Sequence, residues 1–274
     1  MLNLTHEDYR LPEVFALEGL GLMETGTTAP MKIRGVDKSS NERGQYVVKF
    51  YNSGRMSVKS SCRELVGAWI ARELGINVIE PVIVDVSPKF IELLLGKGGY
   101  MAAQKSVGLN FGSVYESGFM EFIEGKKVME NHLFEQAKLI FMFDMFVSND
   151  DRGAGKPNVM TNGKELLVYD HELAFSFADL LSFSQNPEPW IIGESEREMY
   201  ERHYFYKYLR SRSIDFMPLV SKLEGINDVF WQKVNSQIPE HWRTEDLIKI
   251  REYLTKIVEN KEIFAAQLTK VLLS

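Results

Sequence analysis

The sequence has almost no cysteine, and this excludes several classes of protein. Its single cysteine, Cys62, cannot form an internal disulfide, which argues against a secreted scaffold built on disulfides. No cluster of cysteine and histidine has the spacing of a zinc site. Because Cys62 falls in a predicted helix, we expect it to be a small buried residue rather than a nucleophile.

The chain also has no excess of positive charge and no long apolar run, and we expect no leader peptide. A net charge of -6 gives no electrostatic footprint for nucleic acid, so we expect no nucleic-acid partner. Residues 1–10 are mixed and polar, unlike a signal peptide. The apolar run 139–147 is shorter than a membrane span, and Asp144 interrupts it. We therefore expect a cytoplasmic protein without a membrane partner.

What the chain does contain is a change from strand-like to helix-like patterns along its length. Its 274 residues are sufficient for one large domain or two small lobes. Strand patterns occur at 14–22, 31–36, 45–51 and 78–86, the last with Pro81 inside it, and more weakly at 102–107 and 110–115. One helix is predicted from Ser60 or Ser61 to Gly75, and a short one at 90–95.

The second part of the chain is mainly helical. Asn131 is a plausible N-cap of a helix, and Asn162-Gly163 predicts a two-residue hairpin turn between strands at 159–160 and 166–169. Further helices are predicted at 194–209, 216–223, 229–236 and 245–271. The pattern predicts an α+β fold with a strand-rich N-lobe over 1–118 and a helical C-lobe over 119–274.

Two loop segments carry side chains suited to phosphoryl transfer, residues 149–158 (NDDRGAGKPN) and 168–171 (VYDH). Asp151 can orient a hydroxyl group and accept its proton. Asn158 and Asp170 offer hard oxygen ligands to Mg²⁺ ions that bridge the phosphates of ATP. This order of residues, with a hairpin between the last two, predicts an ATP-dependent kinase.

Each of these residues also has an ordinary interpretation. Asp150 competes with Asp151 for the role of base, and spacing alone does not choose between them. Asn158 fits a turn, and Asp170 fits a turn or a helix cap, where such residues are common. The set, rather than any member, favours the kinase.

Lys49 and Glu64 are the predicted partners of the ATP phosphates in the first part of the chain. Lys49 closes a strand and Glu64 lies one turn into the following helix, where it can hold the lysine against the phosphates. The alternative is a solvated lysine and an exposed helix glutamate. The turn at 23–30 places Gly26, Thr27 and Thr28 where backbone N–H groups and hydroxyls can contact phosphates. A plain hairpin turn is the alternative there, since neither G-x-G-x-x-G nor a Walker A sequence is present.

These segments resemble the HipA-like kinase family, and more closely its stand-alone branch. That branch carries an Asn-x-Asp-Arg stretch, a following Asn-Pro-Asn or similar, and an Ile-Asp-His segment; here they read 149–152, 156–158 and 169–171. The similarity covers most of the first 175 residues. Phosphatidylinositol kinases carry a related Asp-Arg-Gly loop, so the loop alone does not fix the substrate.

The resemblance implies a bilobal protein-kinase-like fold with ATP in the cleft. By position, it implies that Lys49 contacts the phosphates with support from Glu64, and that Asp151 rather than Asp150 is the base. It assigns Mg²⁺ to Asn158 and Asp170.

The sequence departs from the family pattern directly after Asp170-His171, where glycine is usual and Glu172 stands here. A side chain at that bend would restrict the metal loop or add a carboxylate near it.

The leading hypothesis is a serine/threonine protein kinase. A small-molecule or lipid kinase, or a nucleotidyl transferase, would use the same site on another substrate. A pseudokinase that acts as a nucleotide- or protein-binding module is the alternative that Glu172 favours. A regulatory partner protein is suggested by the family alone.

Overall fold

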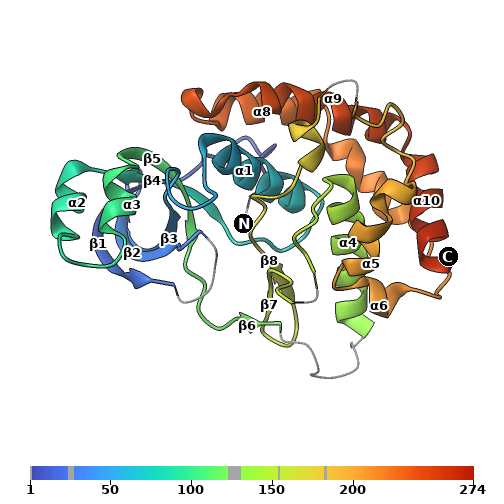
Figure 1. Ribbon diagram of the computed structural model, residues 1–274, viewed down its shortest axis with the longest axis horizontal. Helices are drawn as coiled ribbons and strands as arrows, with labels where there is room; N and C mark the ends of the chain where they lie inside the picture. Colours follow the sequence, from blue (N-terminus) through green and yellow to red (C-terminus); the bar gives the residue numbers. More distant parts are fainter. Residues whose placement is uncertain (1, 24–27, 123–130, 154, 182–183) are drawn as a thin grey trace.

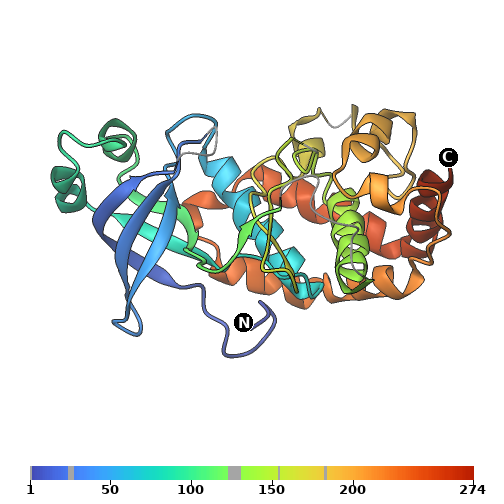
Figure 2. The ribbon, with the colours of Figure 1, turned by 90° about the horizontal axis from the view of Figure 1, so that it is seen from below.

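The computed structural model describes residues 2–23, 28–122, 131–153, 155–181 and 184–274. It is a mixed α+β structure with a strand-rich N-terminal region and a helical C-terminal part, which lie side by side along the long axis (Figures 1 and 2). The described chain contains no helix with both the length and the hydropathy needed to cross a membrane.

The N-terminal strands close into a five-stranded barrel in the order β1-β2-β3-β5-β4, visible end-on in Figure 1. The strands are β1 (Glu13–Leu22), β2 (Met31–Asp37), β3 (Arg43–Lys49), β4 (Pro81–Val86) and β5 (Gly108–Val114). Only the β1–β4 pair is parallel among the pairings of these five strands. Inward-facing residues such as Val14, Ile33 and Val48 form the barrel core, against which α2 (Pro88–Leu93) and α3 (Tyr100–Gln104) pack.

The helical part surrounds a second and larger hydrophobic core. Its helices are α4 (Asn131–Phe146), α5 (Arg197–Arg202), α6 (Tyr206–Leu209), α7 (Met217–Val220), α8 (Asp228–Gln237), α9 (Glu245–Glu259) and α10 (Lys261–Leu273). Short 3₁₀ turns join them at Ser176–Asp179, Glu194–Glu196, Ser221–Gly225 and Glu240–Trp242. A small antiparallel sheet of β6 (Met120–Glu121), β7 (Val159–Thr161) and β8 (Leu166–Val168) borders the cleft. We call the buried residues of this part, with Phe141, Phe146 and Trp242 among them, the larger core.

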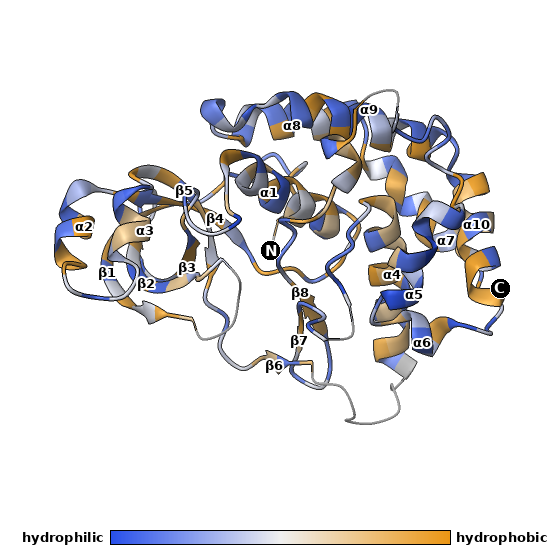
Figure 3. Cartoon of the chain, in the orientation of Figure 1, coloured by the Kyte–Doolittle hydropathy of each residue, from blue (hydrophilic) through white to orange (hydrophobic). Residues whose placement is uncertain are grey.

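The helix α1 (Val58–Glu73) follows the barrel strand β3 but packs in the larger core. Ser57 caps it by accepting a hydrogen bond from the Ser60 backbone N–H. Leu65 and Trp69 are fully buried in the larger core. Figure 1 shows α1 between the barrel and α4, with α8 and α9 above it. The hydropathy colouring of Figure 3 shows polar residues on the outer faces of α8 and α9. The barrel interior and α1 therefore belong to different cores, although Ile83 of β4 and Phe111 of β5 also pack in the larger core.

The predicted strands at 14–22, 31–36, 45–51, 78–86 and 110–115 are confirmed, and the strand at 78–86 begins at Pro81, which has no N–H for an inner ladder position. The weak strand at 102–107 is wrong. Its first residues belong to α3, because Gly99 in the left-handed region (φ 85°) starts a helical turn. The first helix begins at Val58, earlier than Ser60 or Ser61, because Ser57 provides the cap.

Three other boundaries also differ from the prediction. The helix 194–209 is interrupted at His203–Phe205, because Tyr204 donates its N–H to the Arg152 carbonyl at 2.7 Å. The helix 245–271 divides at Asn260 into α9 and α10. The hairpin connects through four residues, 162–165, because Asn162 Oδ1 accepts the N–H groups of Lys164 and Glu165.

Candidate active site

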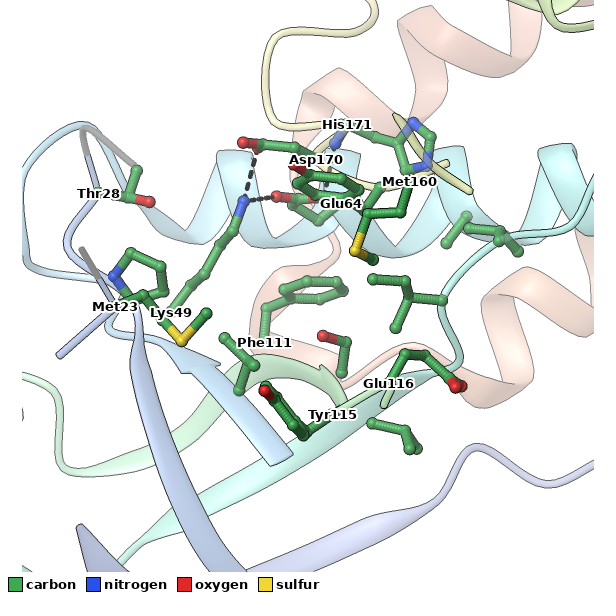
Figure 4. A pocket seen from close by; sticks show the side chains of 18 of the residues that line it. Met23, Thr28, Lys49, Glu64, Phe111, Tyr115, Glu116, Met160, Asp170 and His171 are labelled. Carbon is green, nitrogen blue, oxygen red and sulfur yellow. Dashed lines mark hydrogen bonds and ion pairs between the residues drawn. The ribbon is translucent and has the colours of Figure 1, made fainter. Parts of the chain in front are cut away.

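A cleft between the barrel and the larger core is lined by four of the predicted functional residues, Thr28, Lys49, Glu64 and Asp170 (Figure 4). Apolar side chains of both parts line it, among them Val47, Phe111 and Met160. Its inner end is charged, with Lys49, Glu64 and Asp170. The cleft thus offers an apolar slot for a flat ring next to a charged end.

Lys49 projects from the end of β3 into a group of carboxylates. Its Nζ donates to Glu64 Oε1 and to Asp170 Oδ1, the latter at 2.6 Å, and lies 3.6 Å from Glu172 Oε2. Burial alone would lower the pKa of Lys49, but the three carboxylates outweigh it and raise the pKa above its ordinary value. The alternative of a solvated lysine and an exposed glutamate is wrong, because Glu64 is only 1% exposed.

Glu64 joins Lys49 to the segment that carries Asp170. Its second oxygen, Oε2, accepts the backbone N–H of His171 at 2.7 Å. Both carboxylate oxygens of Glu64 are therefore used, one by the barrel lysine and one by the segment after β8. Asp170 has a left-handed backbone (φ 63°), a conformation that the surrounding contacts must hold in place.

His171 is a buried neutral residue in the larger core. Burial lowers the pKa of its imidazole to about 3. Its ring packs edge-on against Phe143. A Cβ added to Gly67 of α1 would lie only 2.7 Å from the Cβ of His171. Gly67 therefore lets α1 approach the segment that carries Asp170.

Asp151 and Asn158 lie in contact within the loop 149–158, as we expect if both serve one site. Asn158 Nδ2 donates to Asp151 Oδ2 at 3.1 Å and to the Asp151 carbonyl at 3.3 Å. Burial and the neighbouring charge of Asp170 raise the pKa of Asp151. Asp150 is exposed instead, and Arg202 holds its carboxylate at 3.0 and 3.1 Å. The two adjacent aspartates thus face different surroundings.

A buried ionic network holds the loop that carries Asp151. Arg152 donates Nε to Asp144 Oδ2 at 2.5 Å and Nη1 to the carbonyls of Pro157 and Asn158. Asp144 also accepts from Asn149 Nδ2 at 2.7 Å. These bonds fix both ends of the loop to α4.

His203 completes the network around Asp144. Its Nε2 lies 2.9 Å from Asp144 Oδ2. Burial would raise the pKa of Asp144, but Arg152 and His203 lower it below the ordinary value. The interruption of the helix at His203 therefore serves a contact with the loop.

The predicted phosphate-binding turn is described only in part. Thr28 is buried and lines the cleft (Figure 4). Gly26 and Thr27 lie outside the described residues.

Several residues of the site escaped the sequence reasoning. The sequence showed Asp144 only as an interruption of an apolar run. A carboxylate buried in such a run needs a buried partner, and this requirement could have pointed to the network around it. Lys156 lines the cleft with its Nζ 3.8 Å from Asp170 Oδ2. Gly67 could have been noticed as a glycine inside a helix. Glycine destabilises a helix, so its presence there suggests that a close packing contact requires it.

The oxygen donors at the inner end fit a hard divalent cation. Glu64, Asp170 and Glu172 each place a carboxylate oxygen within 4.8 Å of the others. Asn158 Oδ1 is buried without a hydrogen-bond partner among the described residues. Carboxylate and amide oxygens are ligands that Mg²⁺ and Mn²⁺ prefer.

One comparison with known proteins identifies a family for the chain. The model of the HipA-like kinase family matches residues 18–269. A comparison with curated proteins finds no match. Among solved structures, the proinflammatory kinase CtkA of Helicobacter pylori is similar at 14% identity and a TM-score of 0.41, over 92% of this chain and 94% of that chain. Because the family match spans most of the sequence, the chain belongs to the HipA-like kinase family.

Proposed function

We propose that this chain is an ATP- and Mg²⁺-dependent kinase that transfers the γ-phosphate to a hydroxyl group, with protein serine or threonine as the acceptor. The observation that carries the proposal is the contact of Lys49 with Glu64 and Asp170 in one cleft. In phosphoryl transfer, positioning and charge neutralisation provide most of the catalysis, and these side chains have the charges for both.

In this proposal the fold is a bilobal protein-kinase-like one. The N-lobe spans 1–118 and holds the nucleotide phosphates, and the C-lobe spans 119–274 and carries the catalytic loop. The closed barrel on one side of the cleft and the helical part on the other support this division. The adenine ring of ATP would occupy the apolar slot beside Val47, Phe111 and Met160.

The charged end of the cleft would hold the phosphates and metal ions. Lys49, positioned by Glu64, would contact the phosphates, together with the turn that contains Gly26, Thr27 and Thr28. Asn158 and Asp170 would bind Mg²⁺, which neutralises charge on the transferred group. The unpartnered Oδ1 of Asn158 supports this assignment.

Asp151 would orient the acceptor hydroxyl and accept its proton. Its half-buried carboxylate is positioned by Asn158, whereas that of Asp150 is paired on the surface. A second hollow adjoins Asp151 and is lined by Lys156, Tyr204 and Lys207, where an acceptor could approach the proposed base.

A binding module without turnover is the second candidate. Glu172 favours it, because this buried carboxylate lies next to Lys49 and pairs with Arg55 at 3.0 Å. Lys49 would then be held by carboxylates instead of phosphates.

The test is the intact mass of the protein and the nucleotide products after incubation with Mg-ATP and a mixed peptide acceptor. We expect ADP and added phosphate in the wild type. Asp151→Asn should reduce both by about 10²- to 10³-fold, a typical loss for one group that acts in the transition state. Asp150→Asn is the matched control and should retain activity.

Other products would redirect the assignment. Added AMP would indicate nucleotidyl transfer. ATP binding without any product would favour the binding module, and full activity in Asp151→Asn would contradict the proposed base.

A further inference from the structure

Glu172 lies at the charged end of the cleft and is almost fully buried, with 3% of its surface exposed. Its Oε1 accepts from Arg55 Nη2 at 3.0 Å. Its Oε2 faces Lys49 Nζ at 3.6 Å, which is too long for a hydrogen bond, and has no hydrogen-bond partner among the described residues. A buried carboxylate oxygen in this state lacks the compensation that burial requires.

The charges around Lys49 do not balance. Glu64, Asp170 and Glu172 converge on its single ammonium group. Arg55 supplies a second positive charge to Glu172, but its own side chain is 50% exposed. A third cation, the half-exposed Lys156, lies 3.8 Å from Asp170 Oδ2. Three buried carboxylates thus share one buried cation, and solvent screens the two half-exposed cations beside them.

The carboxylates differ in what they can still bind. Both oxygens of Glu64 accept hydrogen bonds, from Lys49 and from the His171 N–H. Asp170 uses Oδ1 for Lys49, and its Oδ2 lies 3.8 Å from the half-exposed Lys156. The oxygens left for a further cation are therefore Asp170 Oδ2 and Glu172 Oε2.

We propose that Glu172 is a direct ligand of a divalent cation, shared with Asp170, and that this pair of carboxylates holds the cation before any nucleotide binds. The inference rests on the proposed function only in its choice of cation, a hard ion such as Mg²⁺ or Mn²⁺. Two carboxylates give a stronger site than one, because the ion then needs no phosphate oxygen to complete its charge compensation. Lys49 stays with Glu64 and is released from the excess of carboxylates.

The test is the binding of Mn²⁺ alone to the full chain, followed by electron paramagnetic resonance of the free ion. We expect saturable binding of Mn²⁺ without nucleotide. Loss of a group that only supports a ligand already costs a metal site about 10- to 100-fold in affinity, so Glu172→Gln should cost at least about tenfold. Asp170→Asn should weaken binding similarly, and Glu121→Gln, an exposed carboxylate of the same cleft, should leave it unchanged.

Arg55→Gln separates a ligand from a salt-bridge partner. If Glu172 binds the ion, removal of Arg55 should leave Mn²⁺ affinity equal or higher, because a competing cation is gone. If Arg55→Gln weakens binding as much as Glu172→Gln does, Glu172 acts through the salt bridge and the proposal is overturned. Wild-type affinity in Glu172→Gln, or no binding to the wild type without nucleotide, would overturn it too.

Two further points keep the test decisive. Should Glu172→Gln fail to fold, Glu172→Asp keeps the charge and withdraws the carboxylate by one methylene; it should weaken Mn²⁺ binding, and unchanged binding would contradict the proposal. The measurement needs neither ATP nor an acceptor, so a chain that proves unable to transfer phosphate still decides it. Phosphate transfer by the wild type together with wild-type Mn²⁺ affinity in Glu172→Gln would overturn this inference alone.

Discussion

The barrel core and the larger core contribute to the cleft in different ways. The barrel provides Lys49 from the end of β3, and the part of the chain around the larger core provides Glu64 and Asp170. Asp151 belongs to that same part and lines an adjoining hollow. Although α1 follows β3 directly, Leu65 and its neighbours on this helix pack in the larger core. The ion pair between Lys49 and Glu64 therefore joins two packing units, while the loop that carries Asp151 is held within one.

This difference indicates that α1 and the helical part form one rigid unit, and that the barrel is the part that could move relative to it. Arg63 on α1 strengthens the attachment of this helix to the helical part, because it pairs with Asp179 at 2.6 Å and Asp246 at 2.9 Å. A movement of the barrel relative to the helical part would carry Lys49 away from Glu64 and leave Glu64 in place.

The largest effect on stability is expected at Asp144, within the larger core. Asp144→Ala leaves Arg152 and His203 without their buried partner. Breaking a buried ion pair by removing one member costs about 3–5 kcal/mol. Denaturant unfolding should show this loss, and Asp150→Ala, which breaks only the surface pair with Arg202, should cost less than about 1 kcal/mol. Equal losses in the two variants would contradict the buried network.

A smaller effect is expected where α1 touches the segment of Asp170. Gly67→Ala places a methyl group 2.7 Å from His171 Cβ, and overpacking of this kind costs about 1–3 kcal/mol. Because Asp170 is adjacent in sequence, turnover of Mg-ATP should fall as well. Gly193→Ala, where an added Cβ meets nothing closer than 3.4 Å, is the matched control. Activity unaffected by Gly67→Ala would show that this contact does not position Asp170.

The sequence located candidate site residues, but it did not show the contacts that surround them. Lys49 and Asp170 were singled out from their places at strand ends, and the structure brings them into contact. The choice of Asp151 over Asp150 came from the family resemblance, because spacing does not separate two adjacent aspartates. The split of the predicted helix at His203–Phe205 was not predicted, since it depends on the hydrogen bond from the Tyr204 N–H to the carbonyl of Arg152, which is distant in the sequence. For the same reason the attachment of α1 to the larger core is not visible in its own periodicity.

The smallest effect is the pH dependence that His203 contributes. Burial holds the pKa of His203 below its ordinary value, so the folded protein keeps it neutral while the unfolded chain binds a proton below about pH 6.5. Stability from this group is therefore complete above about pH 6.5 and falls as the pH decreases, by at most about 1.4 kcal/mol per pH unit.

His203→Gln checks this prediction, because glutamine can still donate to Asp144 but does not titrate. Denaturant unfolding between pH 7 and pH 5 should give a shallower fall for the variant than for the wild type. Identical slopes would mean that His203 is protonated in the folded state.

The central claim is that groups from the two cores form one phosphoryl-transfer site, and the most direct measurement is Mg-ATP turnover in a double-mutant cycle of Lys49→Met and Asp151→Asn. Residues that act as a unit in catalysis give losses that do not add. We expect each single variant to lose about 10²-fold or more, and the double variant to lose no more than the worse of the two. Losses that multiply, or turnover retained in either single variant, would show that Lys49 of the barrel and Asp151 of the helical part do not serve one reaction.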